Sequence, residues 1–296
     1  MSLRASLVLD ARNTLGEGAT WCVRSQSLYW TDIQQSVLWR FHPADGSTRQ
    51  WPMPERLASF ALCADDDWLL LGLVSGLAFF HLQSGELIRI TEVEPGLPTR
   101  LNDGACDRQG RFVFGTLHEP ANGEARRAAG GFYRLKADLS LEQLPLGPVA
   151  ISNSIAFSPD GGTMYYCDSM SRIVHRCTYG DQVTDLRLHI DLSQQHGEPD
   201  GSAVDSDGGL WNAEWGSGRV VRYDRDGKEN LVITVPTQQP TRIAFGGEGL
   251  NTLYITSARD GLSAEALTQD PHAGGLFAVE VPFTGMPEPR FAGRPT

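Results

Sequence analysis

Short apolar runs alternate with polar turns along the whole chain. The sequence has 32 Gly residues, and turn pairs such as Asp45-Gly46, Asp160-Gly161 and Asp226-Gly227 separate the runs. Runs of Val, Ile, Leu, Trp, Tyr and Phe divided by such pairs are typical of antiparallel hairpins. Residues 263–269 differ, because they have a helical composition, are closed by a proline, and begin with Ser263. They predict a short helix with Ser263 as its N-cap.

Six of the apolar runs share one character and recur about every 40 to 50 residues. They are residues 28–32, 69–72, 112–115, 164–168, 210–214 and 253–257. Repeats of this length, built from short strands and turns, are typical of propeller blades. The repeats account for the whole sequence, which predicts an all-β six-bladed propeller with one domain over residues 1–296. We expect a strand over residues 6–11 to complete the last blade and close the ring.

A strand of small residues precedes each apolar run, and in four repeats it begins with a polar residue ten or eleven positions upstream. These residues are Glu17, Asn102, Asn153 and Asp200, whereas the sixth repeat offers Thr241 and the second offers no charged residue. Equivalent positions of a radial repeat lie on a circle, so the four side chains are expected at one mouth of the central channel. Such an oxygen-rich site suits Ca²⁺, Mg²⁺ or Mn²⁺, and Zn²⁺ also accepts carboxylates. Taken singly, Asn-Asp-Gly and Asp-Gly are also ordinary turn sequences.

The charge balance and the cysteines exclude several classes of protein. The chain has 25 Lys and Arg against 36 Asp and Glu, a net charge of −11. This argues against nucleic acid or an anionic membrane as a partner. The five cysteines form no C-x-x-C pair, so neither a zinc knuckle nor a disulfide framework is indicated. Because no apolar stretch is long enough for a membrane span and no signal peptide is evident, we expect a cytoplasmic protein.

Several short motifs occur in a specific order, although each is weak on its own. They are GEGATW at residues 16–21, RLNDG at 100–104, Ser152-Asn153, PDG at 199–201 and LYITSA at 253–258. Together they resemble the regucalcin (senescence marker protein) and gluconolactonase family of six-bladed propellers, over nearly the whole chain. The resemblance implies hydrolysis of sugar lactones to aldonic acids, with one divalent metal ion as cofactor.

The resemblance also implies roles for individual residues. A metal would be held by Glu17, Asn153 and Asp200, with Asp200 also the catalytic base and Glu17 mainly a ligand. Arg100 and Asn102 would contact the substrate, and Glu119 is an approximate match for a further acidic contact. An aldonolactone is already an activated ester, so no nucleophilic Ser or Cys is needed. The sequence also departs from relatives at Ser154-Ile155, where they often carry Gly-Leu.

Three other functions remain open from the sequence. A non-catalytic calcium-binding regulatory protein of the regucalcin type would use the same ring of oxygen ligands. A scaffold propeller would bind protein partners through its rim, and a metal-dependent esterase or phosphotriesterase could use the same architecture. The presence of Arg100 and Asn102 beside the expected metal favours a substrate, with a small sugar lactone as the partner. The sequence does not identify the lactone, its ring size, the metal or the oligomeric state.

Overall fold

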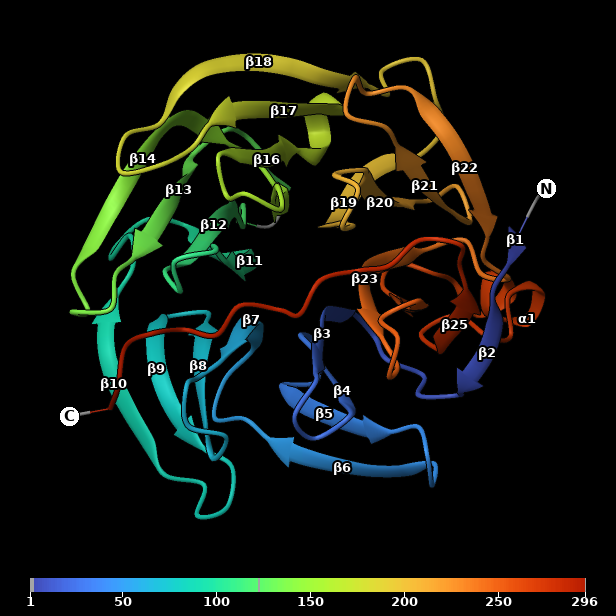
Figure 1. The fold of residues 1–296 in the computed structure, drawn as a ribbon, viewed down its shortest axis with the longest axis horizontal. Helices are drawn as coiled ribbons and strands as arrows, with labels where there is room; N and C mark the ends of the chain where they lie inside the picture. Colours follow the sequence, from blue (N-terminus) through green and yellow to red (C-terminus); the bar gives the residue numbers. More distant parts are fainter. Residues whose placement is uncertain (1–2, 122, 296) are drawn as a thin grey trace.

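The computed structural model describes residues 3–121 and 123–295, so both ends of the predicted range 1–296 lie outside the described residues. Six sheets are arranged in a ring around a central channel (Figure 1). Within each sheet the neighbouring strands are antiparallel, apart from a fifth strand that joins one sheet in parallel. The predicted all-β six-bladed propeller is confirmed.

Each blade has four antiparallel strands, which in blades one to five run outward in sequence order from the innermost strand. Blade five has an additional parallel strand, and the outer strand of blade six comes from the N-terminal part of the chain. Blade one contains β3 (Gly16–Cys22), β4 (Ser27–Asp32), β5 (Val37–His42) and β6 (Ser47–Pro52). Blade two contains β7 (Leu57–Leu62), β8 (Trp68–Leu73), β9 (Gly76–His81) and β10 (Leu87–Glu92). Blade three contains β11 (Thr99–Cys106), β12 (Phe112–His118), β13 (Gly130–Leu135) and β14 (Leu141–Val149).

The remaining three blades follow the same order, and the last one uses a strand from the N-terminus. Blade four contains β15 (Ser152–Phe157), β16 (Thr163–Asp168), β17 (Ile173–Thr178) and β18 (Thr184–Asp191). Blade five contains β19 (Glu198–Val204), β20 (Leu210–Trp215), β21 (Arg219–Tyr223) and β22 (Glu229–Thr234), with β1 (Leu3–Arg4) beside β22. Blade six contains β23 (Pro240–Gly246), β24 (Thr252–Ser257), β25 (Leu276–Glu280) and β2 (Ser6–Leu9).

The strand β2 closes the ring as predicted, because it pairs antiparallel with β25 and becomes the outer strand of blade six. It is two residues shorter than the predicted range 6–11. The one α-helix described, α1 (Ala264–Gln269), is the predicted one, and the side chain of Ser263 caps it by accepting from the Ala266 amide. A short 3-10 turn, η1 (Ser169–Ser171), follows β16. Among the described residues no helix is long and apolar enough to cross a membrane.

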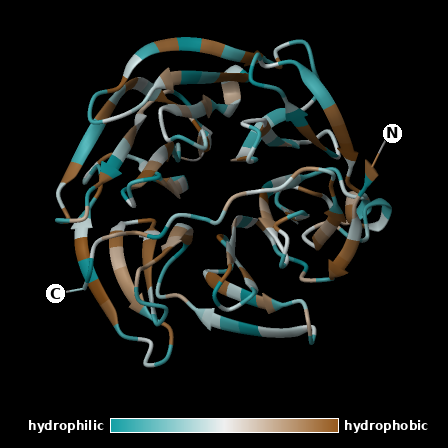
Figure 2. Cartoon of the chain, viewed as in Figure 1, coloured by the Kyte–Doolittle hydropathy of each residue, from teal (hydrophilic) through white to brown (hydrophobic). Residues whose placement is uncertain are grey.

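Apolar side chains of neighbouring blades pack face to face and form the core. The second strand of every blade contributes buried apolar residues, and hydrophobic segments, brown in Figure 2, occur in inner and outer strands alike. Aromatic pairs cross from blade to blade: Trp21 stacks on Tyr254 at 5.5 Å, and Phe132 meets Tyr166 edge-on at 5.3 Å. Aromatic pairs of this geometry stabilise beyond the area they bury. The large aromatic residues of the repeats therefore hold the blades together.

The C-terminal tail, residues 281–295, is an element that the repeats did not predict. It crosses the centre of the ring (red in Figure 1) and bonds to the blades on either side of blade one. The Gly285 amide donates to the Leu250 carbonyl in blade six at 2.7 Å, and the Phe291 amide donates to the Leu62 carbonyl in blade two at 2.8 Å. Phe291 is fully buried. The tail thus ties blades two and six together across one mouth of the channel.

Candidate functional site

A pocket of about 280 Å³ opens at the mouth of the channel opposite the tail, where the innermost strands begin. It is lined by all six residues that the sequence singled out: Glu17, Arg100, Asn102, Glu119, Asn153 and Asp200. Thr241 is not among the lining residues. It is buried, and its hydroxyl lies 2.9 Å from that of Thr256. The structure therefore brings the four ring residues together as the repeat alignment predicted, and their chemical roles stay predictions.

Irregular strand pairing places the ring side chains in the channel. The innermost strand of every blade shifts register against its neighbour near the ring position, for example between Leu101 and Gly104 in β11 and between Pro199 and Ser202 in β19. A β-bulge inserts an unpaired residue and re-aims the side chains around it. Asn102 and Asp200 lie within these two bulges, which explains why both side chains face the channel instead of a neighbouring blade.

Hydrogen bonds fix the amides of the ring. One terminal nitrogen of Arg100 donates to Asn102 Oδ1 at 3.0 Å, and Asn102 Nδ2 donates to Asn153 Oδ1 at 3.1 Å. Asn153 Nδ2 in turn donates to the hydroxyl of Ser169 at 2.9 Å, and that hydroxyl donates to the Pro199 carbonyl at 2.7 Å. This chain of donors leaves the Asn153 oxygen turned toward the pocket and its nitrogen toward η1.

Two carboxylates of the pocket wall, Glu17 and Asp200, are influenced by a third, Asp103. Burial, and next the charge of Asp103, raise the pKa of Glu17. Burial, then Glu17, then Asp103 raise the pKa of Asp200. Burial dominates because a carboxylate removed from water loses solvation, and like charges nearby add to the penalty. Arg242 of blade six offsets part of this negative charge, because it donates a hydrogen bond to Asp103.

The donor set of the ring fits a hard divalent cation. Asp200 Oδ1 is buried and has no hydrogen-bond partner among the described residues, which is costly for a carboxylate oxygen. A cation bound between Glu17 and Asp200 would satisfy that oxygen and balance the two charges, and the Asn153 amide oxygen is a further ligand of the type Ca²⁺ and Mg²⁺ accept. Within the described part of the chain, no three His, Cys, Asp or Glu side chains group as a metal centre. The predicted ligand set therefore depends on an amide.

The carboxylate of Glu119 is engaged by two arginines at the rim of the pocket. Arg56 donates to Glu119 Oε1 at 2.8 Å and to Oε2 at 2.7 Å, and Arg100 Nε donates to Oε1 at 3.1 Å. Hydrogen bonds from Arg56, the largest influence, lower the pKa of Glu119. The sequence-based expectation concerned a substrate contact, which the structure leaves untested. It shows Glu119 in the pocket wall with both oxygens accepting from arginine.

Two residues next to the ring were missed in the sequence, although the same alignment contains them. Asp103 and Arg242 each follow a ring position by one residue, in blades three and six, and both are buried. The position that follows Asn153 explains another observation. Ser154 has a φ of 59°, in the left-handed region that favours glycine, so a Gly there in relatives fits the backbone. The Ser154 hydroxyl donates to the Asp200 carbonyl at 2.7 Å.

The part of the chain that forms this site matches a known protein family. Residues 15–259 match the family described as the SMP-30/Gluconolactonase/LRE-like region. The chain belongs to this family. The match spans all six innermost strands, β3, β7, β11, β15, β19 and β23, together with β24, so it contains every predicted site residue. The resemblance drawn from the short motifs is confirmed.

Relatives within the family include named lactonases and regucalcins. L-arabinolactonase of Azospirillum brasilense is 58% identical over 295 residues, covering 99% of this chain and 97% of that protein. The 6-deoxy-6-sulfogluconolactonase of Pseudomonas putida is 40% identical over 292 residues, covering 97% of this chain and 98% of that protein. The crystal structure of regucalcin from Agrobacterium tumefaciens, a calcium-binding protein, superposes with a TM-score of 0.91 at 30% identity, covering 98% and 99% of the two chains.

Proposed function

We propose that this protein hydrolyses sugar lactones to the corresponding aldonic acids and uses one divalent metal ion. The observation that carries the proposal is the single pocket that contains Glu17, Arg100, Asn102, Asn153 and Asp200. Relatives named for the opening of L-arabinolactone and of 6-deoxy-6-sulfogluconolactone support the substrate class.

Glu17, Asn153 and Asp200 would hold the metal ion. When bound, it would polarise the lactone carbonyl and stabilise the negative charge that develops on its oxygen. Asp200 is the candidate general base: its carboxylate accepts a proton from the attacking water, whose oxygen bonds to the carbonyl carbon. The bond from that carbon to the ring oxygen then breaks, and the proton passes to the leaving oxygen. Water is consumed, and an aldonic acid results.

Arg100 and Asn102 would orient the lactone. Arg100 uses its Nε toward Glu119 and one terminal nitrogen toward Asn102 and the Leu101 carbonyl at 2.8 Å. The other terminal nitrogen has no hydrogen-bond partner among the described residues, so it remains available to ring hydroxyls or to the ester oxygen. Because the guanidinium is planar and held on two sides, little side-chain entropy is lost when it binds substrate.

A second candidate is a calcium-binding protein without turnover. The similarity to regucalcin supports it, since the ring would bind Ca²⁺ in either case. A pH-indicator assay distinguishes the two. Purified protein is treated with a chelator, dialysed, and mixed with a panel of 1,4- and 1,5-aldonolactones in the presence of Ca²⁺, Zn²⁺, Mg²⁺ or Mn²⁺. Acid release above the spontaneous rate, dependent on added metal, is expected. Metal binding without acid release from any lactone would favour the regulatory protein.

A further inference from the structure

One side of the pocket has more positive charge than its partners neutralise. Three arginines, Arg56, Arg100 and Arg126, gather where blades two and three meet, and we name this group the arginine rim. Arg100 and Arg126 line the pocket together with Glu119, and Arg56 lies behind Glu119. Burial lowers the pKa of Arg100 to about 10, and the charges of Arg56 and Arg126 contribute to the shift. Arg56 and Arg126 therefore both lie close enough to Arg100 to act on its charge.

Glu119 can balance one of these three charges. Both of its oxygens already accept hydrogen bonds, from Arg56 and Arg100. Arg126 has no ion-pair or hydrogen-bond partner among the described residues, although it is part-buried at the pocket wall. The chain as a whole has a net charge of −11, so a local excess of positive charge on one side of a pocket is unusual for it. Such an excess favours the binding of an anionic ligand.

The opposite side of the pocket has the opposite charge. Glu198, at the start of β19 in blade five, and Asp260, after β24 in blade six, line the pocket there. Glu198 lies 3.5 Å from Arg172, whereas Asp260 forms no ion pair among the described residues. Blades two and three face blades five and six across the ring (Figure 1). A ligand with an anionic group would thus enter in one orientation, with that group toward the arginine rim and away from Glu198 and Asp260.

The loop that carries Arg126 is attached to the blade below it. This loop joins β12 to β13, and the Arg127 amide donates to Nδ1 of His118, the last residue of β12, at 3.2 Å. His118 is 1% exposed, so the hydrogen bond attaches the loop to a buried side chain. The side chain of Arg127 itself is exposed and does not line the pocket. Adjacent arginines therefore differ in placement, and only Arg126 faces the site.

We propose that Arg126 is a substrate-binding residue for an anionic group, so that the enzyme prefers sugar lactones that carry a carboxylate at the end distal to the lactone carbonyl. This inference rests on the proposed lactonase function. A carboxylate can accept two parallel hydrogen bonds from a guanidinium, and such charge-assisted pairs are roughly twice as strong as neutral ones. A neutral hydroxymethyl group at the same place would leave the charge of Arg126 unpaired.

A matched pair of substrates tests the proposal. D-glucaro-1,4-lactone and D-glucono-1,4-lactone have the same ring and differ in a carboxylate against a hydroxymethyl group. The parent protein is expected to open the acidic lactone with the higher kcat/KM. Arg126→Gln is expected to reduce the ratio of the acidic to the neutral kcat/KM by about tenfold or more, as expected for a lost hydrogen bond between charged groups. Arg127→Gln removes the same charge one residue away and should leave the ratio unchanged.

Binding measurements separate the failure of this inference from the failure of the lactonase proposal. Calorimetry of the open-chain acids, glucarate against gluconate, measures the preference for the distal carboxylate without turnover. A preference for glucarate that is lost in Arg126→Gln supports the arginine rim even where no lactone is opened. Equal kcat/KM for the two lactones in the parent, or equal losses in Arg126→Gln and Arg127→Gln, would overturn it.

Discussion

Arg242 of blade six donates to Asp103 of blade three across the channel, and these two side chains lie 139 positions apart in sequence. Asp103 also accepts from the amides of Gly104 and Ile155, each at 2.8 Å, so its carboxylate joins blades three, four and six. Gly201 permits the contact, because a Cβ on it would lie 2.3 Å from Arg242 Cδ. The residue after the candidate base is therefore a glycine for a steric reason.

The Asp103–Arg242 pair should show strong energetic coupling. Arg242→Met leaves Asp103 buried without its cation, and breaking one side of a buried pair typically costs about 3–5 kcal/mol. Asp103→Asn combined with Arg242→Met removes both charges and should cost much less than the sum of the single changes. Urea unfolding of the four proteins after chelation measures the free energies of unfolding. Simple additivity would show that the pair contributes no coupling.

Glu17→Gln should weaken metal binding and leave the fold intact. The substitution keeps an oxygen but removes one of the two charges of the predicted ligand set, and we expect a loss of at least about tenfold in affinity by analogy with supporting residues of metal sites. Isothermal calorimetry with Ca²⁺ and Zn²⁺ gives the affinity. Glu198→Gln is the matched control, since Glu198 lines the same pocket outside the ring. Equal losses in both variants would contradict the ligand assignment.

Asp200→Asn should abolish most of the lactone opening at saturating metal. The amide keeps an oxygen ligand but accepts no proton, and general-base contributions are on the order of 10²- to 10⁴-fold. The measurement is kcat from initial rates, after subtraction of spontaneous hydrolysis. An increase in metal concentration should not restore it. Turnover like that of the parent would mean that another group deprotonates water.

His189 should make the fold less stable in acid. Burial, and next the charge of Arg176, lower the pKa of His189 from 6.5 to about 4. The folded protein therefore holds His189 neutral, and the unfolded chain gains a proton first as the pH falls. The contribution is full above pH 6.5 and is lost progressively between about 6.5 and 4. The free energy of unfolding of His189→Phe should decline less over this range than that of the parent, as measured in urea at several pH values.

Phe291→Ala should destabilise the protein although it lies far from the pocket. Phe291 is fully buried, packs against Phe79 at 6.0 Å, and belongs to the tail. Large-to-small changes at such sites cost about 3–5 kcal/mol. Leu188→Ala is a control, because Leu188 is 55% exposed and should change stability by less than about 0.5 kcal/mol. A loss no greater than the control's would mean that the tail is held by its backbone bonds alone.

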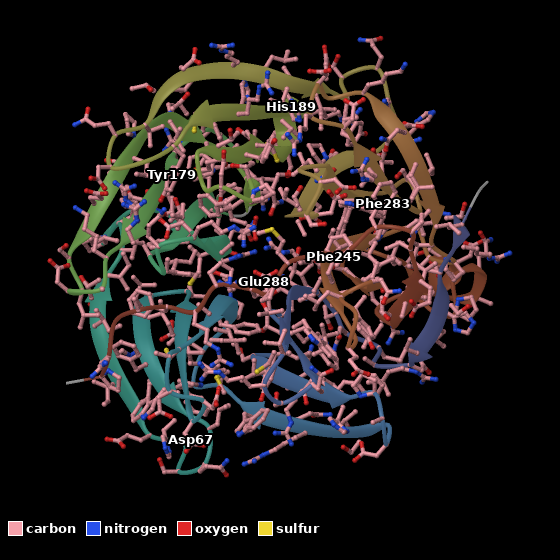
Figure 3. All side chains as sticks on the ribbon, viewed as in Figure 1. Asp67, Tyr179, His189, Phe245, Phe283 and Glu288 are labelled. Carbon is pink, nitrogen blue, oxygen red and sulfur yellow. The ribbon has the colours of Figure 1, made fainter. Side chains whose placement is uncertain are left out.

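Radial repetition made the blades and the ring predictable from one sequence. A single apolar run such as residues 164–168 is ambiguous, but six runs in register define a closed ring, and the ring in turn brings Glu17 and Asp200 together. The tail was not predictable in this way, because it has no counterpart in the repeats and is held by main-chain bonds such as that of Gly285. Its half-buried Glu288 (Figure 3) looks like an ordinary polar residue in the sequence.

The charged pairs around the ring could not be predicted from the sequence for a different reason. Arg56 precedes blade two, where the repeat alignment offers no charged ring residue, and its partner Glu119 follows blade three's second strand, 63 positions later. No local spacing connects them. Asp103 and Arg242 lie next to ring positions in blades that face one another, so the pair becomes visible only once the number of blades is known. The repeat symmetry predicts which residues lie on the ring. Which charged residues pair across the ring becomes known only from the closed structure.

The strand β2 has a consequence for synthesis of the protein on the ribosome. Residues 6–9 are synthesised well before their partner β25, at residues 276–280. Until β25 is made, β2 has no antiparallel partner in blade six, and the ring around Glu17 is not closed. A fragment that ends before residue 276 lacks β25 and therefore cannot pair β2 into blade six.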